Sequence, residues 1–244
     1  MKPTPTSPNN AALLAFGAHP DDIEFGCGGV IAIETQCGRK AHMVVCSRGE
    51  AGSSGTPEQR VQEAKTGAEI LGATLEFAEL DGDARLEIRT AHAIALAAII
   101  RRVKPGIVLA PSPSPNQHPD HSRLGQLVRD AARLARYGNL DELRAQPPHA
   151  IDALLFYEVT SDSAESGQSP LLVDVSDPAV MTAWTRSMEA HASQLRTRNY
   201  VELRLTRARL NGLRGGVGHA IALHPNDPLI VESLSQVCRG ARAF

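Results

Sequence analysis

Two short segments of the sequence combine histidine and aspartate at spacings that suit a metal ion. The first reads His-Pro-Asp-Asp at residues 19–22, and the second reads His-Pro-Asp-His at residues 118–121. A catalytic zinc ion takes three ligands from histidine and carboxylate side chains and leaves one position for water. His19 and Asp22 can bind one ion from a single tight turn, and His121 can complete the set. We therefore predict a zinc site, although ferrous iron accepts the same ligands.

The other polar side chains of these segments can move protons. If Asp22 binds the metal, Asp21 is free to act as general base toward a water that the metal activates. His118 can stabilise a developing oxyanion or protonate a leaving amine. Asp120 can hold His118 in one tautomer, as carboxylates beside metal sites do. Either segment alone is explained equally well as an aspartate-rich capping turn, but the pair favours hydrolytic chemistry.

Alternating strands and helices must bring the two segments together. Short apolar runs predict strands at 12–16, 41–46, 75–78, 107–110, 153–159 and 171–175, and another short apolar run lies at 221–223. Helical spacing of apolar residues predicts helices at 25–36, 57–71, 88–103, 122–136, 178–195 and 201–210. This alternation predicts an α/β fold with a doubly wound, mostly parallel sheet covered by helices on both faces. Both segments follow strands, so they should meet at the carboxyl edge of that sheet.

Three neighbouring features have both a functional and a structural interpretation. The glycine-rich stretch at residues 25–29 does not have the spacing of a nucleotide-binding loop, so we expect it to pack the helix start against the metal segment. Glu50 follows the second strand and either lines the cleft or only shapes its loop. Arg60 can reach a bound ligand, although a solvated arginine is the usual case for such a position.

Composition places the chain among ordinary globular proteins. Its 244 residues carry a net charge of −2 without a block of like charges, which argues against a nucleic-acid or acidic-membrane partner. The longest apolar run, 93–100, is far short of the roughly 20 residues that span a membrane. Residues 1–10 lack the apolar core of a secretion signal, and we expect a flexible tail followed by one domain at 11–244. The four cysteines form no CxxC pair, which favours a reducing, cytoplasmic location.

The two segments and their surroundings resemble the PIG-L / LmbE-like deacetylases. The similarity rests on Ala-His-Pro-Asp-Asp-Ile-Glu-Phe-Gly-Cys-Gly-Gly at residues 18–29, followed by residues 118–121. It is strong to residue 137 and looser beyond. Members of this family are zinc enzymes with a Rossmann-like fold, and they remove the acetyl group from N-acetylglucosamine in glycoconjugates and sugar-linked thiols.

The resemblance implies a role for each residue named above. His19, Asp22 and His121 match the family's zinc ligands, and Asp21 matches its general base. His118 matches the histidine that stabilises the oxyanion, and Asp120 matches the acidic partner of that histidine. Arg60 matches a substrate-binding arginine, and Tyr200 matches a mobile tyrosine near the metal. Gln117 replaces an arginine of bacillithiol-type relatives, and the stretch 192–200 is shorter, which argues against their malate-linked substrate. Relatives often form trimers or hexamers, so the resemblance also implies a homo-oligomer.

We therefore expect zinc-dependent removal of the acetyl group from an N-acetylglucosamine-containing small molecule or glycoconjugate. An enzyme of the same family acting on a non-sugar or thiol-conjugate amide is the nearest alternative. A metal-dependent phosphoesterase would need two metal ions and more carboxylate ligands than the sequence offers. A non-catalytic binding domain would not need Asp21 or His118, because neither is required to hold zinc.

Overall fold

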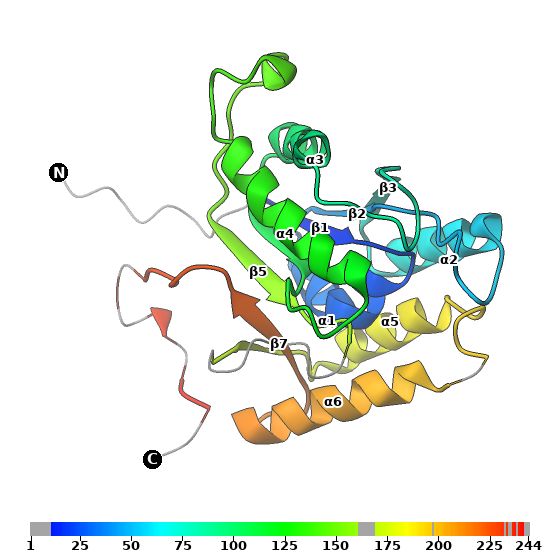
Figure 1. Cartoon of the computed structure of the whole chain (residues 1–244). Coiled ribbons are helices and arrows are strands. Elements are labelled where there is room, and N and C mark those ends of the chain that lie inside the picture. The colour runs from blue at the N-terminus through cyan, green and yellow to red at the C-terminus, as the bar shows by residue number, and fades with distance from the viewer. Residues whose placement is uncertain are drawn as a thin grey trace.

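A seven-stranded sheet runs through the centre of the protein in the order β3-β2-β1-β4-β5-β7-β6 (Figure 1). The computed structural model describes residues 11–160, 169–196, 198–231, 233, 236–237 and 239–241, so the predicted flexible tail at 1–10 lies outside the described residues. The strands are β1 Ala12–Gly17, β2 Ala41–Val45, β3 Thr74–Phe77, β4 Pro105–Pro111, β5 Ala153–Tyr157, β6 Leu171–Asp174 and β7 Ala220–Pro225. Strands β1 to β5 are parallel, whereas β7 is antiparallel to both of its neighbours. The predicted mostly parallel α/β architecture is confirmed.

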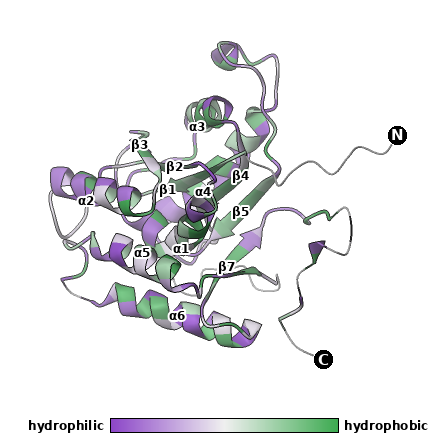
Figure 2. Ribbon diagram, turned by 180° about the vertical axis from the view of Figure 1, so that it is seen from behind, coloured by the Kyte–Doolittle hydropathy of each residue, from purple (hydrophilic) through white to green (hydrophobic). Residues whose placement is uncertain are grey.

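Helices cover both faces of the sheet. They are α1 Asp22–Gln36, α2 Pro57–Ile70, α3 Thr90–Val103, α4 Pro119–Leu134, α5 Pro178–Glu189 and α6 Tyr200–Gly215, with a 3-10 turn at Asp141–Leu143. Helices α3 and α4 pack together against one face, and α1, α2, α5 and α6 contribute to the core of the other (Figures 1 and 2). This is the doubly wound arrangement that the alternation of elements predicts.

The side chains of each central strand divide between two separate cores. In β1, Leu13 and Ala15 belong to the core under α1 and α5, whereas Leu14 and Phe16 belong to the core under α3 and α4. Successive residues of a strand point to opposite faces, so a strand covered on both sides must be apolar throughout. The unbroken apolar runs in the sequence therefore mark the strands that hold the site.

Two helices begin earlier than predicted, and both carry site residues. Helix α1 begins at Asp22 instead of residue 25, and α4 begins at Pro119 instead of residue 122. Proline is well tolerated at the first helical position, and an acidic side chain in the first turn interacts favourably with the helix dipole. The ligand segments are thus junctions between a strand and a helix, which is a more rigid setting than the loops expected from the sequence.

The glycines at the start of α1 permit close packing, as predicted, but against different partners. A Cβ atom on Gly26 would lie 2.2 Å from the ring of Tyr157 on β5. A Cβ atom on Gly28 would lie 2.9 Å from Trp184 on α5. The helix therefore packs tightly against β5 and α5, whereas the sequence suggested contact with the metal segment.

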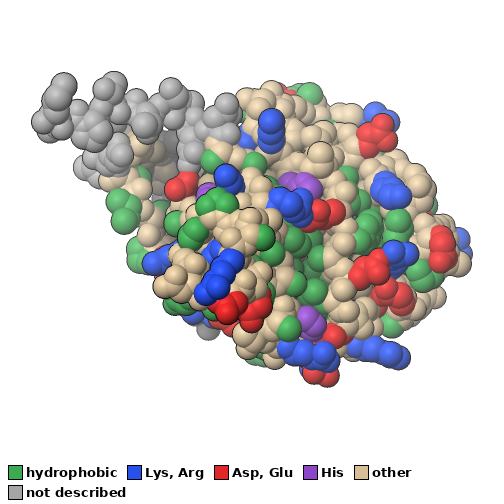
Figure 3. All heavy atoms as spheres, turned by 90° about the horizontal axis from the view of Figure 1, so that it is seen from above, with side chains coloured by type: hydrophobic (Ala, Val, Ile, Leu, Met, Phe, Trp, Pro, Cys, Tyr) green, Lys and Arg blue, Asp and Glu red, His purple; other side chains and the backbone are tan. Residues whose placement is uncertain are grey.

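The surface and the cysteines add two observations. Among the described helices none has the length and apolarity needed to cross a membrane. On the face seen in Figure 3, acidic and basic side chains are interspersed, so neither sign dominates that face. Cys27, Cys37 and Cys46 are free thiols, and Cys238 lies outside the described residues.

Candidate active site

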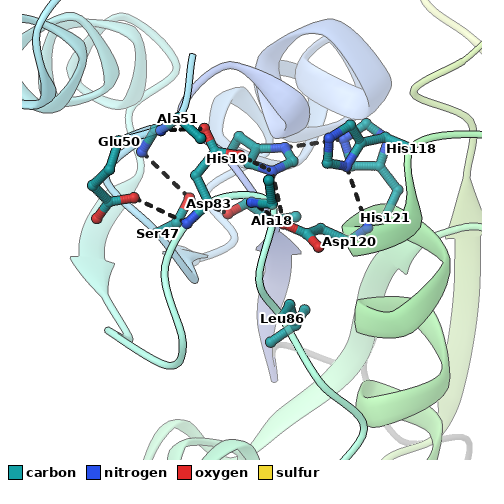
Figure 4. A network of polar contacts seen from close by, with 12 residues as sticks. Ala18, His19, Ser47, Glu50, Ala51, Asp83, Leu86, His118, Asp120 and His121 are labelled. Carbon is teal, nitrogen blue, oxygen red and sulfur yellow. Dashed lines mark hydrogen bonds and ion pairs between the residues drawn. The ribbon is translucent and has the colours of Figure 1, made fainter.

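The two ligand segments meet at the carboxyl ends of the adjacent strands β1 and β4. The chain leaves β1 toward β2 on one side, while β4 lies on the other side, so a crevice opens between the two connections. The β1–α1 junction supplies His19 and Asp22, and the start of α4 supplies His121. The loop after β3 brings a further acidic side chain, Asp83, to the same edge (Figure 4). Sheet topology alone therefore gathers residues from three distant parts of the chain.

Three buried side chains direct their donor atoms at one another. Nδ1 of His19 lies 3.2 Å from Nε2 of His121 and 3.5 Å from Oδ2 of Asp22. Nε2 of His121 lies 3.0 Å from Oδ1 of Asp22. Bonds of about 2.0–2.2 Å to a tetrahedral ion would separate its ligand atoms by roughly 3.3–3.6 Å. The Asp22 carboxylate faces His19 through Oδ2 and His121 through Oδ1, and these pairwise spacings suit the ligands of a metal ion. The rings of His19, His118 and His121 form a second group whose nitrogen atoms lie close enough together to hold an ion.

The electrostatics of this cluster are those of a cation site. Burial by itself would lower the pKa of His19, but the charge of Asp22 and hydrogen bonds with Asp120, Asp22 and Asp83 outweigh it and raise the pKa to about 12. Burial likewise opposes ionisation of Asp22, yet the charges of His121 and His19 hold the pKa of this carboxyl well below its usual range. Opposite charges at this distance favour the ionised forms of both partners. The negative potential around His19 would serve a bound cation in the same way.

The far side of the His19 ring is held by two carboxylates. Its Nε2 lies 3.1 Å from Oδ1 of Asp83 and 3.3 Å from Oδ2 of Asp120. The same Asp120 oxygen accepts a hydrogen bond of 2.6 Å from the amide of Ala84, which ties the β3–α3 loop to α4. Carboxylates that bind the outer nitrogen of a ligand histidine fix its tautomer and orientation. Sequence reasoning missed Asp83; the available signal was an acidic residue in the loop after a third parallel strand.

His118 caps α4 and presents its ring to the cluster. Its Nδ1 accepts a hydrogen bond of 3.2 Å from the amide of Asp120, and its ring centre lies 4.8 Å from that of His19. A neutral imidazole that accepts at Nδ1 carries its proton on Nε2. Burial and then the charges of His19 and His121 lower the pKa of His118, which favours this neutral form. Asp120 therefore contacts His118 through its backbone amide, whereas the sequence analysis assigned this contact to its carboxylate.

Asp21, the N-cap residue of α1, has an unusual backbone conformation. Its φ of 112° and ψ of −29° lie in the left-handed region that non-glycine residues rarely adopt. Such strain costs of order 1–3 kcal/mol and concentrates at functional positions. Burial and the charge of neighbouring Asp22 raise the pKa of Asp21 to about 6. The carboxyl group is therefore poised to exchange a proton near neutral pH.

Arg60 lies between Asp21 and the acidic loop after β3. This buried guanidinium donates to the carbonyl oxygens of Pro20 at 2.9 Å and Gly49 at 3.3 Å. It also lies 3.6 Å from Oδ2 of Asp21 and 3.8 Å from Oδ2 of Asp83. Arg60 lines the cleft, as a substrate-binding residue would, but its charge is shared with two carboxylates.

A cleft of about 630 Å³ opens above these residues. Tyr200 lines it from the first turn of α6 and makes an edge-to-face contact with Phe25, the ring centres being 6.5 Å apart. Glu50 is not among the described residues that line the cleft; its carboxylate instead accepts from the amides of Arg48 and Asp83, at 3.0 and 3.1 Å. This placement corresponds to the loop-shaping role that the sequence left open for Glu50.

Fold and site together define a Rossmann-like hydrolase. Its candidate catalytic side chains lie at the carboxyl ends of β1 and β4, where the order of the strands reverses. Residues 14–132 match the family model PIG-L, described as GlcNAc-PI de-N-acetylase. A diacetylchitobiose deacetylase of Thermococcus kodakarensis is 31% identical over 194 residues, covering 75% of this chain and 69% of that protein. The chain therefore belongs to the PIG-L family, and the deacetylase relative supports a hydrolytic N-deacetylase activity.

Two further relatives are not described as deacetylases. The chain is 32% identical over 157 residues to a 4-oxalmesaconate hydratase of Pseudomonas putida, a match that covers 58% of this chain and 60% of that protein. The crystal structure of a conserved protein from Thermus thermophilus is similar with a TM-score of 0.80 at 30% identity, covering 91% of this chain and 97% of that one. The likeness in fold thus extends well beyond the segment that the family model matches.

Proposed function

We propose that the protein removes the acetyl group from an N-acetylglucosamine-containing small molecule or glycoconjugate, with a zinc ion held by His19, Asp22 and His121. The observation that carries this proposal is the close approach of these three side chains in pairs, at 3.0 to 3.5 Å, with Oδ2 of Asp22 facing His19 and Oδ1 facing His121. Bound zinc would polarise the amide carbonyl and lower the pKa of a water molecule to about 7. Ferrous iron remains a second candidate for the physiological metal.

The protein's own residues account for the proton movements of such a hydrolysis. Asp21 takes a proton from the attacking water and returns it to the amide nitrogen as the C–N bond breaks. A carboxyl group with a pKa of about 6 is well matched to this exchange at neutral pH. The Nε2–H group of His118 donates a hydrogen bond to the oxygen that becomes negative. The products are acetate and a free amine.

The wider setting completes the proposal. The cleft has room for an amino sugar, with Arg60 and Tyr200 as substrate-binding side chains and Glu50 supporting the loop behind them. Asp120 positions His19 through its carboxylate and His118 through its amide.

We also propose one catalytic domain at 11–244, a cytoplasmic location, a homo-oligomer of the trimeric or hexameric kind, and no nucleic-acid or membrane partner.

Acetate release tests the function directly. Zinc-loaded protein is incubated with N-acetylglucosamine, diacetylchitobiose and N-acetylglucosamine conjugates, and Asp21→Asn is assayed alongside. Acetate from at least one sugar, reduced by orders of magnitude in the variant, is the expected result. Acetate from thiol-conjugate or non-sugar amides alone would keep the chemistry but reject the amino sugar as substrate.

A hydratase is the second candidate function, and the Pseudomonas putida relative is the observation that favours it. Hydration and amide hydrolysis both need a base that activates water, so Asp21 would serve either reaction. An unsaturated tricarboxylic acid of the kind that this relative's name describes therefore belongs in the same panel, followed by its ultraviolet absorbance. Loss of absorbance without acetate release from any amide would favour the hydratase.

A further inference from the structure

The charges that line the cleft are distributed unevenly. On the side of the metal ligands, Arg60 is balanced by the carboxylates of Asp21 and Asp83. Another part of the wall is formed by α6 and the segment before it, and it contributes Arg198 and Arg204. Among the described residues, neither of these two arginines forms an ion pair. The cleft thus holds, besides its acidic and histidine groups, two positive charges without an ion-pair partner among the described residues.

Arg204 is held in place without being neutralised. Its Nη1 donates to the carbonyl oxygen of Glu158 at 3.1 Å, at the end of β5. The Glu158 carboxylate itself forms an ion pair with Arg207, one turn further along α6, and lies 3.8 Å from His224. Burial and then repulsion from Arg207 lower the pKa of Arg204 to about 10, and they outweigh the opposing charges of Glu158, Asp22 and Asp21. Its remaining N–H groups are available to a ligand in the cleft.

Arg198 lies at the rim of the same wall. Its guanidinium carbon is 5.7 Å from the ring centre of Tyr200, a distance at which the ring face attracts a cation. Tyr200 in turn makes an edge-to-face contact with Phe25, which also lines the cleft. Arg198 is exposed, which leaves its planar donor group free to meet a substrate entering the cleft.

We propose that Arg198 and Arg204 bind an anionic group of the substrate, and that the enzyme therefore prefers acylated amino sugars bearing a phosphate or a carboxylate. The geometry of a guanidinium matches both groups, because two parallel N–H donors can meet two oxygens. A partly buried charge without a counter-ion also gains more from an incoming anion than a solvated one does. This inference rests on the proposed function, since it specifies the substrate of that same site.

Binding measurements test the inference separately from catalysis. Isothermal titration compares N-acetylglucosamine 6-phosphate and N-acetylmuramic acid with neutral N-acetylglucosamine, using zinc-loaded Asp21→Asn protein so that no substrate is consumed. Hydrogen bonds between charged groups predict that the anionic sugars bind about 10- to 100-fold more tightly than the neutral one. Preference for only one of the two anionic sugars would tell whether a phosphate or a carboxylate is recognised.

Substitutions assign any preference to the two arginines. Arg204→Gln and Arg198→Gln, each added to Asp21→Asn, should lower the ratio of anionic to neutral affinity by about tenfold or more. Arg209→Gln is the matched control, because Arg209 is an exposed arginine of the same helix that donates to the Gly218 carbonyl outside the cleft. It makes the same change in net charge and should keep the full ratio. If Arg204→Gln does not fold, Arg198→Gln still carries the test.

The outcomes separate this inference from the proposed function. Equal binding of all three sugars, or a preference that survives both arginine substitutions, overturns the inference even if acetate is released. A preference lost in both variants supports the inference, and it does so even if no acetylated sugar is hydrolysed. In that second case the deacetylase proposal fails alone, and an anionic substrate of another kind must be sought.

Discussion

Nε2 of His19 lies 3.1 Å from Oδ1 of Asp83, a residue that comes from a different crossover of the sheet. The other ring nitrogen of His19 faces His121 and Asp22. Its outer nitrogen is therefore held by carboxylates, and its inward nitrogen is the one that would bind a metal ion after losing its proton. Asp83 thus acts as a positioning residue, and its effect must pass through His19.

Replacing Asp83 should weaken metal binding without removing a ligand. Loss of a carboxylate behind a ligand histidine typically costs 10- to 100-fold in metal affinity, and we expect this range for Asp83→Ala. Competition with a chromogenic chelator measures the affinity. Asp81→Asn is the control from the same loop, because Asp81 pairs with Arg89 and accepts from the amide of Glu87. Equal zinc affinity in wild type and Asp83→Ala would show that Asp83 does not position His19.

Metal stoichiometry separates a deacetylase from a two-metal phosphoesterase. Among the described residues two further groups could hold an ion, His19 with His118 and His121, and His19 with Asp83 and Asp120. Both include His19, as the proposed set with Asp22 does, so all three compete for one side chain. We expect one zinc per chain by elemental analysis, complete loss of acetate release after chelation, and recovery when zinc is added back. His121→Ala should lose the bound zinc, and two ions per chain in the wild type would contradict the single site.

The pH dependence of the rate of acetate release should identify the general base. Asp21 has a pKa raised to about 6 by burial and by the charge of Asp22, and only its ionised form accepts a proton. The rate should therefore be full above that pH and fall about tenfold per unit below it. Asp21→Asn should retain zinc but lose about 10²- to 10⁴-fold in rate, the usual share of a general base. A wild-type rate that stays flat down to pH 4 would exclude this role.

A buried ion pair below the site should govern stability. Nε2 of His191 lies 3.2 Å from Oε1 of Glu24, and neither side chain is exposed. His191→Leu should cost about 3–5 kcal/mol in unfolding free energy, because it leaves a buried carboxylate unpaired. His42→Gln, on a partly exposed pair with Glu76, should cost much less. Urea titration measures both values, and equal losses would contradict the argument.

The same pair has a pH signature of defined sign. Burial opposes the charge on His191, but Glu24 outweighs it and raises the pKa above the ordinary value of 6.5. A histidine whose pKa is higher in the folded than in the unfolded protein stabilises the fold. This contribution is complete below pH 6.5 and is lost as pH rises through the pKa of the folded protein. Wild-type unfolding free energy should therefore decline at alkaline pH, and this part of the slope should vanish in His191→Leu. A slope that persists in the variant must come from other groups.

Local spacing predicted the parts of the site that belong to one turn of chain. His19 and Asp22 are three residues apart, so any compact backbone brings them together. Asp83 and Arg204 carry no such signal, since their positions depend on which loops meet at the sheet edge. The sequence predicted that Asp120 contacts His118, but not that its amide makes this contact while its carboxylate faces His19. Both contacts follow from α4 beginning at Pro119 and not from residue type.

The start of α1 should tolerate no added side-chain atom at Gly26. A Cβ atom there would lie 2.2 Å from Cδ2 of Tyr157, a fully buried ring whose hydroxyl donates to the carbonyl of Phe16 at 2.6 Å. Tyr157 cannot turn aside without losing that bond, so α1 must shift. Overpacking of this kind costs about 1–3 kcal/mol or more, and we expect at least that loss in Gly26→Ala.

Because α1 begins at Asp22, the shift forced by Gly26→Ala should also disturb the metal ligands and lower zinc affinity. Gly138→Ala is the matched control, since the nearest atom to its new Cβ would be 3.8 Å away. Urea unfolding and zinc competition measure the two effects on both variants. A Gly26→Ala protein as stable as Gly138→Ala would show that α1 and β5 can separate. Lost stability with unchanged zinc affinity would show instead that the ligand turn is held by β1 and Arg60 independently of its helix.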